Sequence, residues 1–232
     1  MVSSKHAFWI ALVFTIIVFI VGLIFGYFLE SSRSSKVELA LLGSEADILD
    51  EQLRSRIISE SNVCCDLAKE STFAFADRVY EEALKLEQYD SSSKFDKETL
   101  EALHKRYDVL RMMLWMESIK LKERCDNFEI LVYFFSYKGD DIKVKAEQSF
   151  FSRLLIDIKN AHPDEILLIP IASDLNVSSV DLTLKQYNIS KTPSILINEK
   201  KVVSEVIKIE EMEDLIFSET AESLDELVCA RE

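Results

Sequence analysis

Thiol chemistry needs cysteines, and three of the four cysteines are spaced so that they could take part in it. Cys64 and Cys65 are adjacent, and Cys125 follows about 60 residues later. One interpretation is a dithiol system that exchanges disulfides, but no histidine or cluster of bases lies nearby in sequence to lower a thiol pKa. The other interpretations are inert thiols in a reducing cytosol and a structural disulfide. The elements that carry the cysteines favour the disulfide.

The cysteines lie on or beside two predicted helices, at about 62–89 and 97–125. The polar linker Asp90–Asp96 is long enough to reverse the chain and short enough to make the helices antiparallel neighbours. If the hairpin turns near Ser93, Cys65 comes within about one helical turn of Cys125. We therefore expect Cys65 or Cys64 to pair with Cys125 at the open end of the hairpin. Such a bridge implies an oxidising compartment.

A hydrophobic segment comes first in the chain. After a short tail (residues 1–6), Ala7–Leu29 contains no charged residue and is long enough, at roughly 23 positions, to cross a ~30 Å hydrocarbon core. A cleaved signal peptide is the alternative, but its apolar core is usually shorter. Gly22 and Gly26 form a GxxxG pair, which predicts either a close approach of two such helices in a homodimer or a chance spacing. Flanking charges do not decide orientation, and the expected disulfide favours an extracytoplasmic soluble arm.

Composition and motifs exclude several function classes. The net charge of -14, without a compact basic cluster, argues against nucleic-acid binding. Outside the apolar segment the only glycines are Gly43 and Gly139, so no glycine-rich phosphate loop can form. The three histidines are scattered, and no metal ligand set accompanies them. We expect no metal, no cofactor and no catalytic residue of a known motif.

A helical module is predicted over residues 30–126, and its first helix covers about 37–59. Apolar residues recur there at helical spacing, at Leu42, Ala46, Leu49, Leu53 and Ile57. We expect this face to pack against the next helices of the same chain. A brief coiled coil between two chains is the alternative.

The pattern changes at about residue 127. Phe128–Phe135 is an apolar run typical of a strand buried on both faces, and helices and strands alternate after it to about residue 217 in the order βαβαββα. This order predicts an α/β fold, with a parallel pair of strands and a terminal antiparallel hairpin in one sheet. Pro170 places the second strand at an edge of that sheet, because proline cannot donate a ladder hydrogen bond. An acidic helix or tail is expected over 218–232.

This element order, with Thr192-Pro193 directly before the third strand, resembles the thioredoxin-like superfamily over residues 127–217. The likeness is carried by the order and by the segment Ile189–Ser194. It implies that Pro193 follows a cis peptide bond and that the backbone of Thr192 pairs with an extended peptide. Redox members of the family carry Cys-x-x-Cys after the first strand, whereas Ser136–Gln148 here contains no cysteine.

The sequence therefore favours a membrane-anchored, redox-inactive thioredoxin-like protein that binds or scaffolds another protein. An oxidoreductase or isomerase that uses Cys64, Cys65 and Cys125 is the alternative from a different class. A structural assembly factor of a membrane complex is a third hypothesis. The expected partners are the bilayer, through residues 7–29, and a protein that the sequence does not identify.

Overall fold

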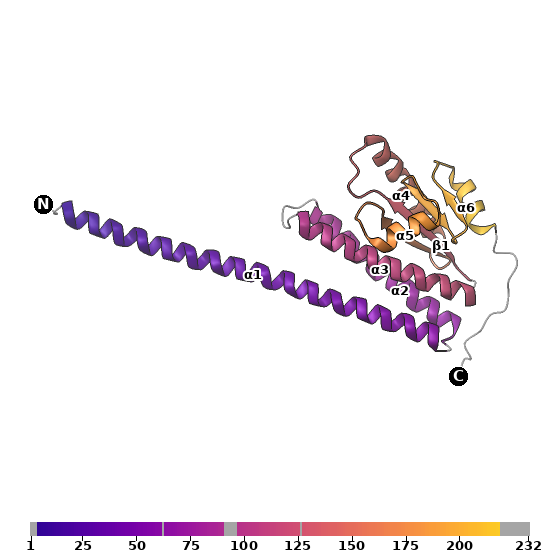
Figure 1. Ribbon diagram of the computed structural model, residues 1–232, viewed down its shortest axis with the longest axis horizontal. Coiled ribbons are helices and arrows are strands. Elements are labelled where there is room, and N and C mark those ends of the chain that lie inside the picture. The colour runs from indigo at the N-terminus through magenta and orange to yellow at the C-terminus, as the bar shows by residue number, and fades with distance from the viewer. Residues whose placement is uncertain (1–3, 62, 91–96, 126, 219–232) are drawn as a thin grey trace. The chain divides into compact units, whose positions relative to one another are not determined.

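The computed structural model describes residues 4–61, 63–90, 97–125 and 127–218. The chain divides into two compact units, Met1–Asp50 and Glu51–Glu232, which are described separately. The fold is mixed α/β and mostly helical (Figure 1).

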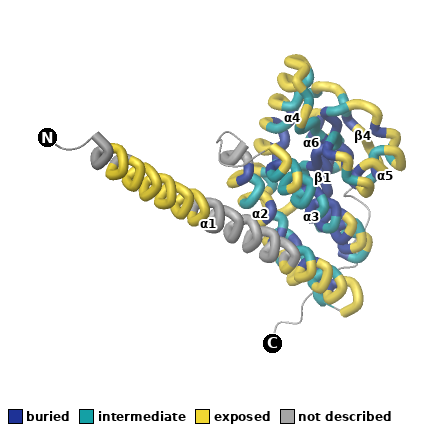
Figure 2. The backbone as a smooth tube through the Cα atoms, turned by 60° about the vertical axis from the view of Figure 1, so that its left-hand side comes forward, coloured by how far each residue is buried: buried dark blue, intermediate teal, exposed yellow. Residues whose placement is uncertain are grey.

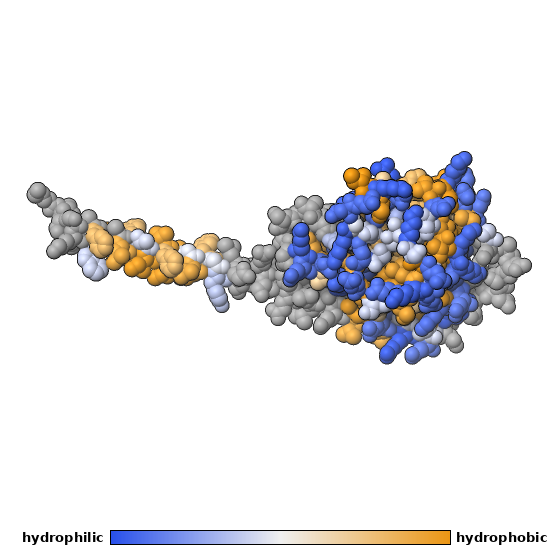
Figure 3. Space-filling view, turned by 45° about the horizontal axis from the view of Figure 1, so that its top comes forward, coloured by the Kyte–Doolittle hydropathy of each residue, from blue (hydrophilic) through white to orange (hydrophobic). Residues whose placement is uncertain are grey.

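The first unit consists of the N-terminal part of helix α1 (Ser4–Glu60). Its stretch Phe8–Phe28 is exposed, and it is long and apolar enough to cross a membrane (Figure 3). The helix runs without a break through the polar segment Ser31–Lys36. Serine, arginine and lysine fit a helix, and the segment lacks the glycine or proline that would interrupt one. The expected helix at 37–59 is thus the continuation of the apolar one.

In the second unit, the end of α1 joins a hairpin of α2 (Cys65–Asp90) and α3 (Lys97–Arg124). The apolar face expected to pack here does not do so. Within this unit Leu53 and Ile57 are 58% and 49% exposed, so the expectation is wrong for these two residues. Ala46 and Leu49 belong to the first unit, and the side chain of Leu42 lies outside the described residues.

The buried side of α1 carries charges that are paired with one another. The Arg54 guanidinium lies 2.5 Å from Glu51 Oε1 and 2.7 Å from Glu117 Oε2, and it donates to Thr72 Oγ1 at 3.2 Å. Glu51 and Glu117 are only 1% and 3% exposed. Hydropathy periodicity cannot find such a face, because its charged residues are buried only when they compensate one another.

Burial also shifts the protonation of this cluster. Burial, assisted by the neighbouring Glu51 carboxylate, raises the pKa of Glu117 to about 8 against the opposing effect of Arg54. Burial likewise raises the pKa of Asp108 on α3 to about 6, although Arg111 opposes this. Both carboxyls are therefore easier to protonate in the folded chain than in the unfolded one.

The disulfide at the open end of the hairpin is present, as expected. Cys65 at the start of α2 is bonded to Cys125 after α3, with a Cα–Cα distance of 5.6 Å. Both residues are buried, at 1% and 4% exposure. Cys64 is also disulfide-bonded, so none of the three is a thiol.

The sheet contains four strands in the order β2-β1-β3-β4. They are β1 (Glu129–Phe135), β2 (Ile166–Ala172), β3 (Ser194–Ile197) and β4 (Lys201–Val203). β2 is parallel to β1, and the other two pairs are antiparallel. Helices α4 (Ile142–Ala161), α5 (Ser178–Gln186) and α6 (Ile209–Phe217) complete the predicted order, and Pro170 lies on an edge strand as predicted.

Alternating side chains of β1 build two cores, which is why the strand is buried throughout (Figure 2). On one face Leu131 and Tyr133 pack with α4 and α6, through residues such as Leu155 and Met212. On the other face Phe134 meets Trp115 of α3, with ring centroids 6.0 Å apart. Helix α3 therefore serves both the helical hairpin and the sheet.

We expect the stability of the second unit to fall as pH rises towards 8. The folded-state pKa of Glu117 lies above its ordinary value of 4.5, so its contribution is complete below about pH 4.5 and is lost through about pH 8. The loss is on the order of a few kcal/mol. Asp108 adds a smaller loss between about pH 4 and 6.

Urea unfolding across this pH range measures the effect. Glu117→Gln should flatten the decline above pH 6, because glutamine does not titrate. The control Glu81→Gln, at an exposed position on α2, should follow the wild-type curve. A wild-type stability that rises between pH 6 and 8 would contradict this assignment.

Candidate functional site

The loop between β1 and α4 is held by one carboxylate. Asp174, which follows β2, accepts hydrogen bonds from Ser136 Oγ at 2.6 Å and from the backbone N–H groups of Tyr137 and Lys138, both at 2.8 Å. The N–H of Gly139 donates to Ser136 Oγ at 2.9 Å. A Cβ at Gly139 would lie 2.5 Å from that oxygen, so the close approach requires glycine. The loop donors are thus used inside the protein.

Gln148 of α4 fixes the start of the same loop. Its Oε1 accepts from the Ser136 N–H at 2.9 Å, and its Nε2 donates to the Ser136 carbonyl at 3.2 Å. Asp141 caps α4 by accepting from the N–H groups of Lys143 and Val144. Aspartate is a common N-cap residue for this reason. The loop is therefore preorganised, and its acidic residue has a structural role.

Thr192 and Pro193 lie beside this loop, at the entry to β3. The bond between them is cis, as the family resemblance implied. Ser194 pairs with Phe134 near the C-terminal end of β1, and Lys191 Nζ lies 4.0 Å from Glu147 Oε2 on α4.

The two residues differ in what they expose. Pro193 is buried and Thr192 is half-buried. Neither the N–H nor the C=O of Thr192 makes a hydrogen bond with another residue that the structure describes. Its backbone therefore has one free donor and one free acceptor.

The cysteines are not part of this arrangement. Cys125 precedes the first residue of β1, whereas the Thr192-Pro193 segment adjoins the far end of that strand. Seven residues of strand separate the two ends by about 20 Å. The cysteine pair and the proline turn that the sequence singled out are thus two separate places.

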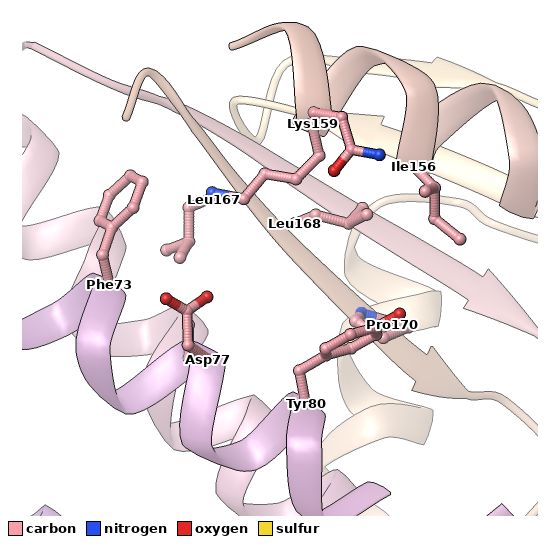
Figure 4. A pocket seen from close by; sticks show the side chains of 10 residues that line it. Phe73, Asp77, Tyr80, Ile156, Lys159, Leu167, Leu168 and Pro170 are labelled. Atoms are coloured by element: carbon pink, nitrogen blue, oxygen red, sulfur yellow. The ribbon is translucent and has the colours of Figure 1, made fainter. Parts of the chain in front are cut away.

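A second candidate surface is an apolar groove along the edge strand β2, with a volume of about 220 Å³. Figure 4 shows Phe73, Asp77 and Tyr80 of α2 facing β2, with Ile156 and Lys159 of α4 across from them. This groove could not be predicted from the sequence, because its residues come from three elements, and the periodicity of each element does not show which of them are neighbours.

The edge of β2 is closed to an additional strand. Lys159 Nζ donates to the Ile166 carbonyl at 2.8 Å, and Pro170 has no N–H. The Ala172 N–H donates to Asp108 Oδ1 at 3.3 Å. These are protections typical of natural sheet edges. The groove can receive side chains, and these contacts disfavour the pairing of a further strand along its edge.

The pairing of two helices through Gly22 and Gly26 stays a prediction. Gly22 and Gly26 lie on α1, and a Cβ at either would meet nothing within 4 Å. No group of three His, Cys, Asp or Glu residues in the described part of the chain could hold a metal.

No protein-family model matches the chain, and no curated protein matches its sequence. Among solved structures, the chain is similar to oxidized thioredoxin O2 from Arabidopsis thaliana, with 14% sequence identity and a TM-score of 0.31. The match covers 46% of this chain and 87% of that one.

Asp174 and Gln148 were not found from the sequence. The available signal was positional: Asp174 follows a strand parallel to β1, and the carboxyl ends of parallel strands meet at one edge of a sheet. Nothing in the helical pattern of α4 distinguishes Gln148 from other polar residues.

We expect Asp174→Ala to destabilise the loop by about 2 to 4 kcal/mol, because it removes three hydrogen bonds to a charged acceptor. Hydrogen exchange should show faster exchange at the amides of Tyr137 and Lys138. The control Asp140→Ala, at an exposed loop position, should leave those amides protected. Unchanged exchange in Asp174→Ala would refute the assigned role.

Proposed function

We propose that this chain is a membrane-anchored, redox-inactive protein with a thioredoxin-like domain, which binds an extended segment of another protein at Thr192. The observation that carries the proposal is the free N–H and C=O of Thr192 beside a loop without cysteine. An extended peptide satisfies one donor and one acceptor of this kind by pairing alongside them.

The preorganised loop supports binding over chemistry. Its N–H groups already donate to Asp174 and to the Ser136 hydroxyl, so they offer little to a reacting oxyanion. What remains for a partner is the Thr192 backbone and the surrounding side chains. Because the rigid loop needs no reordering, binding there loses little conformational entropy.

The buried disulfide argues against the alternative of thiol exchange. An exchanging disulfide must be attacked by an outside thiolate, and Cys65 and Cys125 are both almost inaccessible. They also lie at the end of β1 remote from Thr192. In the proposed function this bridge clamps the helical hairpin.

Phe8–Phe28 supplies the proposed anchor, through its length and apolar character. A disulfide persists in oxidising compartments, which supports an extracytoplasmic position for the arm. The chain would then present its binding surface to other proteins outside the cytoplasm.

Site-specific photocrosslinking in intact cells tests the proposal. A benzophenone amino acid at Thr192 of the full chain should give a discrete adduct with another protein. The matched control places the same group at Lys185, which is exposed on α5. Thr192→Ala, which keeps the backbone groups, should still co-purify with the captured protein. The proposal is wrong if positions 192 and 185 give the same adducts or none.

A further inference from the structure

Cys64 holds a disulfide bond whose partner is neither Cys65 nor Cys125. Those two cysteines are bonded to each other, so both of their sulfur atoms are used. Cys64 is nevertheless disulfide-bonded as well. The chain has four cysteines, and the fourth, Cys229, lies outside the described residues. Because cysteines of one chain in an oxidising compartment pair with one another, Cys229 is the expected partner of Cys64.

The described chain ends close to the start of β1. Phe217, the last residue of α6, packs its ring against that of His162 after α4, with the ring centres 4.8 Å apart. The carbonyl of His162 accepts a hydrogen bond from the N–H of Ile166, the first residue of β2. Ile166 is paired in parallel with Glu129, the first residue of β1. The end of α6 therefore lies at the end of the sheet where β1 begins.

The start of α2 lies at this same end of the sheet. Lys159 Nζ, one helical turn before the end of α4, lies 4.8 Å from the centre of the Phe73 ring. Phe73 also packs against Phe128, which precedes β1, with ring centres 5.7 Å apart. Along α2, Phe73 is about two helical turns from Cys65, the residue after Cys64. A series of direct contacts thus leads from the end of α6 to Cys64.

The segment from Ser218 to Cys229 is long enough to cover this path. Its eleven residue steps reach up to about 36 Å when extended. The longest part of the path is the stretch of α2 from Phe73 to Cys65, which rises about 12 Å. The other parts of the path are single side-chain contacts and one turn of α4. Cys229 can therefore meet Cys64 without any movement of the folded elements.

The two bridges differ in their exposure to solvent. Cys65 and Cys125 are buried, at 1% and 4% exposure, whereas Cys64 is half-buried in the short segment between α1 and α2. A disulfide is reduced when an outside thiolate reaches one of its sulfur atoms. A bridge at Cys64 is consequently open to reductants that the Cys65–Cys125 bridge excludes.

We propose that Cys64 and Cys229 form a second disulfide, which ties the C-terminal segment to the start of α2 and which opens before the Cys65–Cys125 bridge. A dithiol reductant opens it in two steps: one thiolate breaks the S–S bond and forms a mixed disulfide, and the second thiolate resolves it. The reductant leaves as a disulfide, and Cys64 and Cys229 become thiols that carry its two protons. This proposal is independent of the proposed function, because it involves neither Thr192 nor the β1–α4 loop.

Peptide mapping of the full chain, purified in detergent micelles without reductant, tests the pairing. The chain is unfolded, labelled with a maleimide and digested with trypsin, which releases Cys64 and Cys65 on one peptide, 57–69. In the wild type this peptide should remain linked both to 125–138 and to 209–231, which carry the other two cysteines. No cysteine should react with the maleimide.

Serine variants assign each bond. Cys64→Ser should leave one reactive thiol, at Cys229, and should keep the link between 57–69 and 125–138. Cys229→Ser is the reciprocal variant, and it should leave one reactive thiol at Cys64. The control Ser61→Ala, at an exposed position near Cys64, should show no reactive thiol. A wild-type chain whose Cys229 reacts before reduction, or whose Cys64 is linked to a second copy, would overturn the proposal.

Graded reduction of the folded chain with dithiothreitol tests the order of opening. Maleimide label should appear at Cys64 and Cys229 at least ten times faster than at Cys65 and Cys125, because only the first bridge is accessible. Equal rates at the two bridges would overturn the proposed order.

Discussion

The burial of Trp115 is the interaction on which the rest of the second unit depends. Its side chain is completely buried, and its ring packs 6.0 Å from that of Phe134 and 5.9 Å from that of Tyr187. Its indole N–H donates to Glu199 Oε1 at 2.5 Å. An aromatic residue of this size contributes much apolar area while its polar end still finds a partner. Trp115 therefore connects α3 with β1, with the segment after α5 and with the β3–β4 turn.

The turn that holds Glu199 shows the same coupling. Asn198 and Glu199, the central residues of a turn closed by the Lys200 N–H to the Ile197 carbonyl, both have positive φ angles, 47° and 57°, as in a type I′ turn. Asparagine tolerates this region, and its side chain bonds the Ile130 N–H at 2.9 Å as well as Glu129. Lys122 of α3 donates to Glu129 at 3.0 Å. Polar contacts therefore repeat the connection that Trp115 makes through packing.

Because these contacts fix α3, each end of this helix positions other parts of the second unit. Towards its C-terminus it carries Glu117, which belongs to the charge cluster, and Arg124, which directly precedes the disulfide-bonded Cys125. Towards its N-terminus, Lys138 of the β1–α4 loop pairs with Glu101 at 2.8 Å, and His104 contacts Tyr137. The loop beside Thr192 thus contacts the same helix that ends at the disulfide near the other end of β1.

The sequence predicted what local patterns determine. The order of strands and helices after Phe128 and the edge position of Pro170 followed from apolar runs and from the residues that separate them. Hairpin geometry predicted that Cys64 or Cys65 pairs with Cys125, and the bonded residue is Cys65. Three features did not follow. The buried face of α1 is charged, so hydropathy indicated the exposed face instead. Helix α3 packs against α2 and also against the sheet, and the periodicity of one helix cannot show two such faces. Asp174 reaches a loop far from it in sequence, and only the paired strands connect the two.

The central claim is that the arrangement around Thr192 holds another chain and does not exchange thiols with it. The most direct measurement is the rate at which the full chain accelerates the reduction of insulin by dithiothreitol. The account predicts the rate of dithiothreitol alone, because Cys65 and Cys125 are buried at the opposite end of β1 from Thr192. Turnover above that rate, abolished by Cys65→Ser, would contradict it.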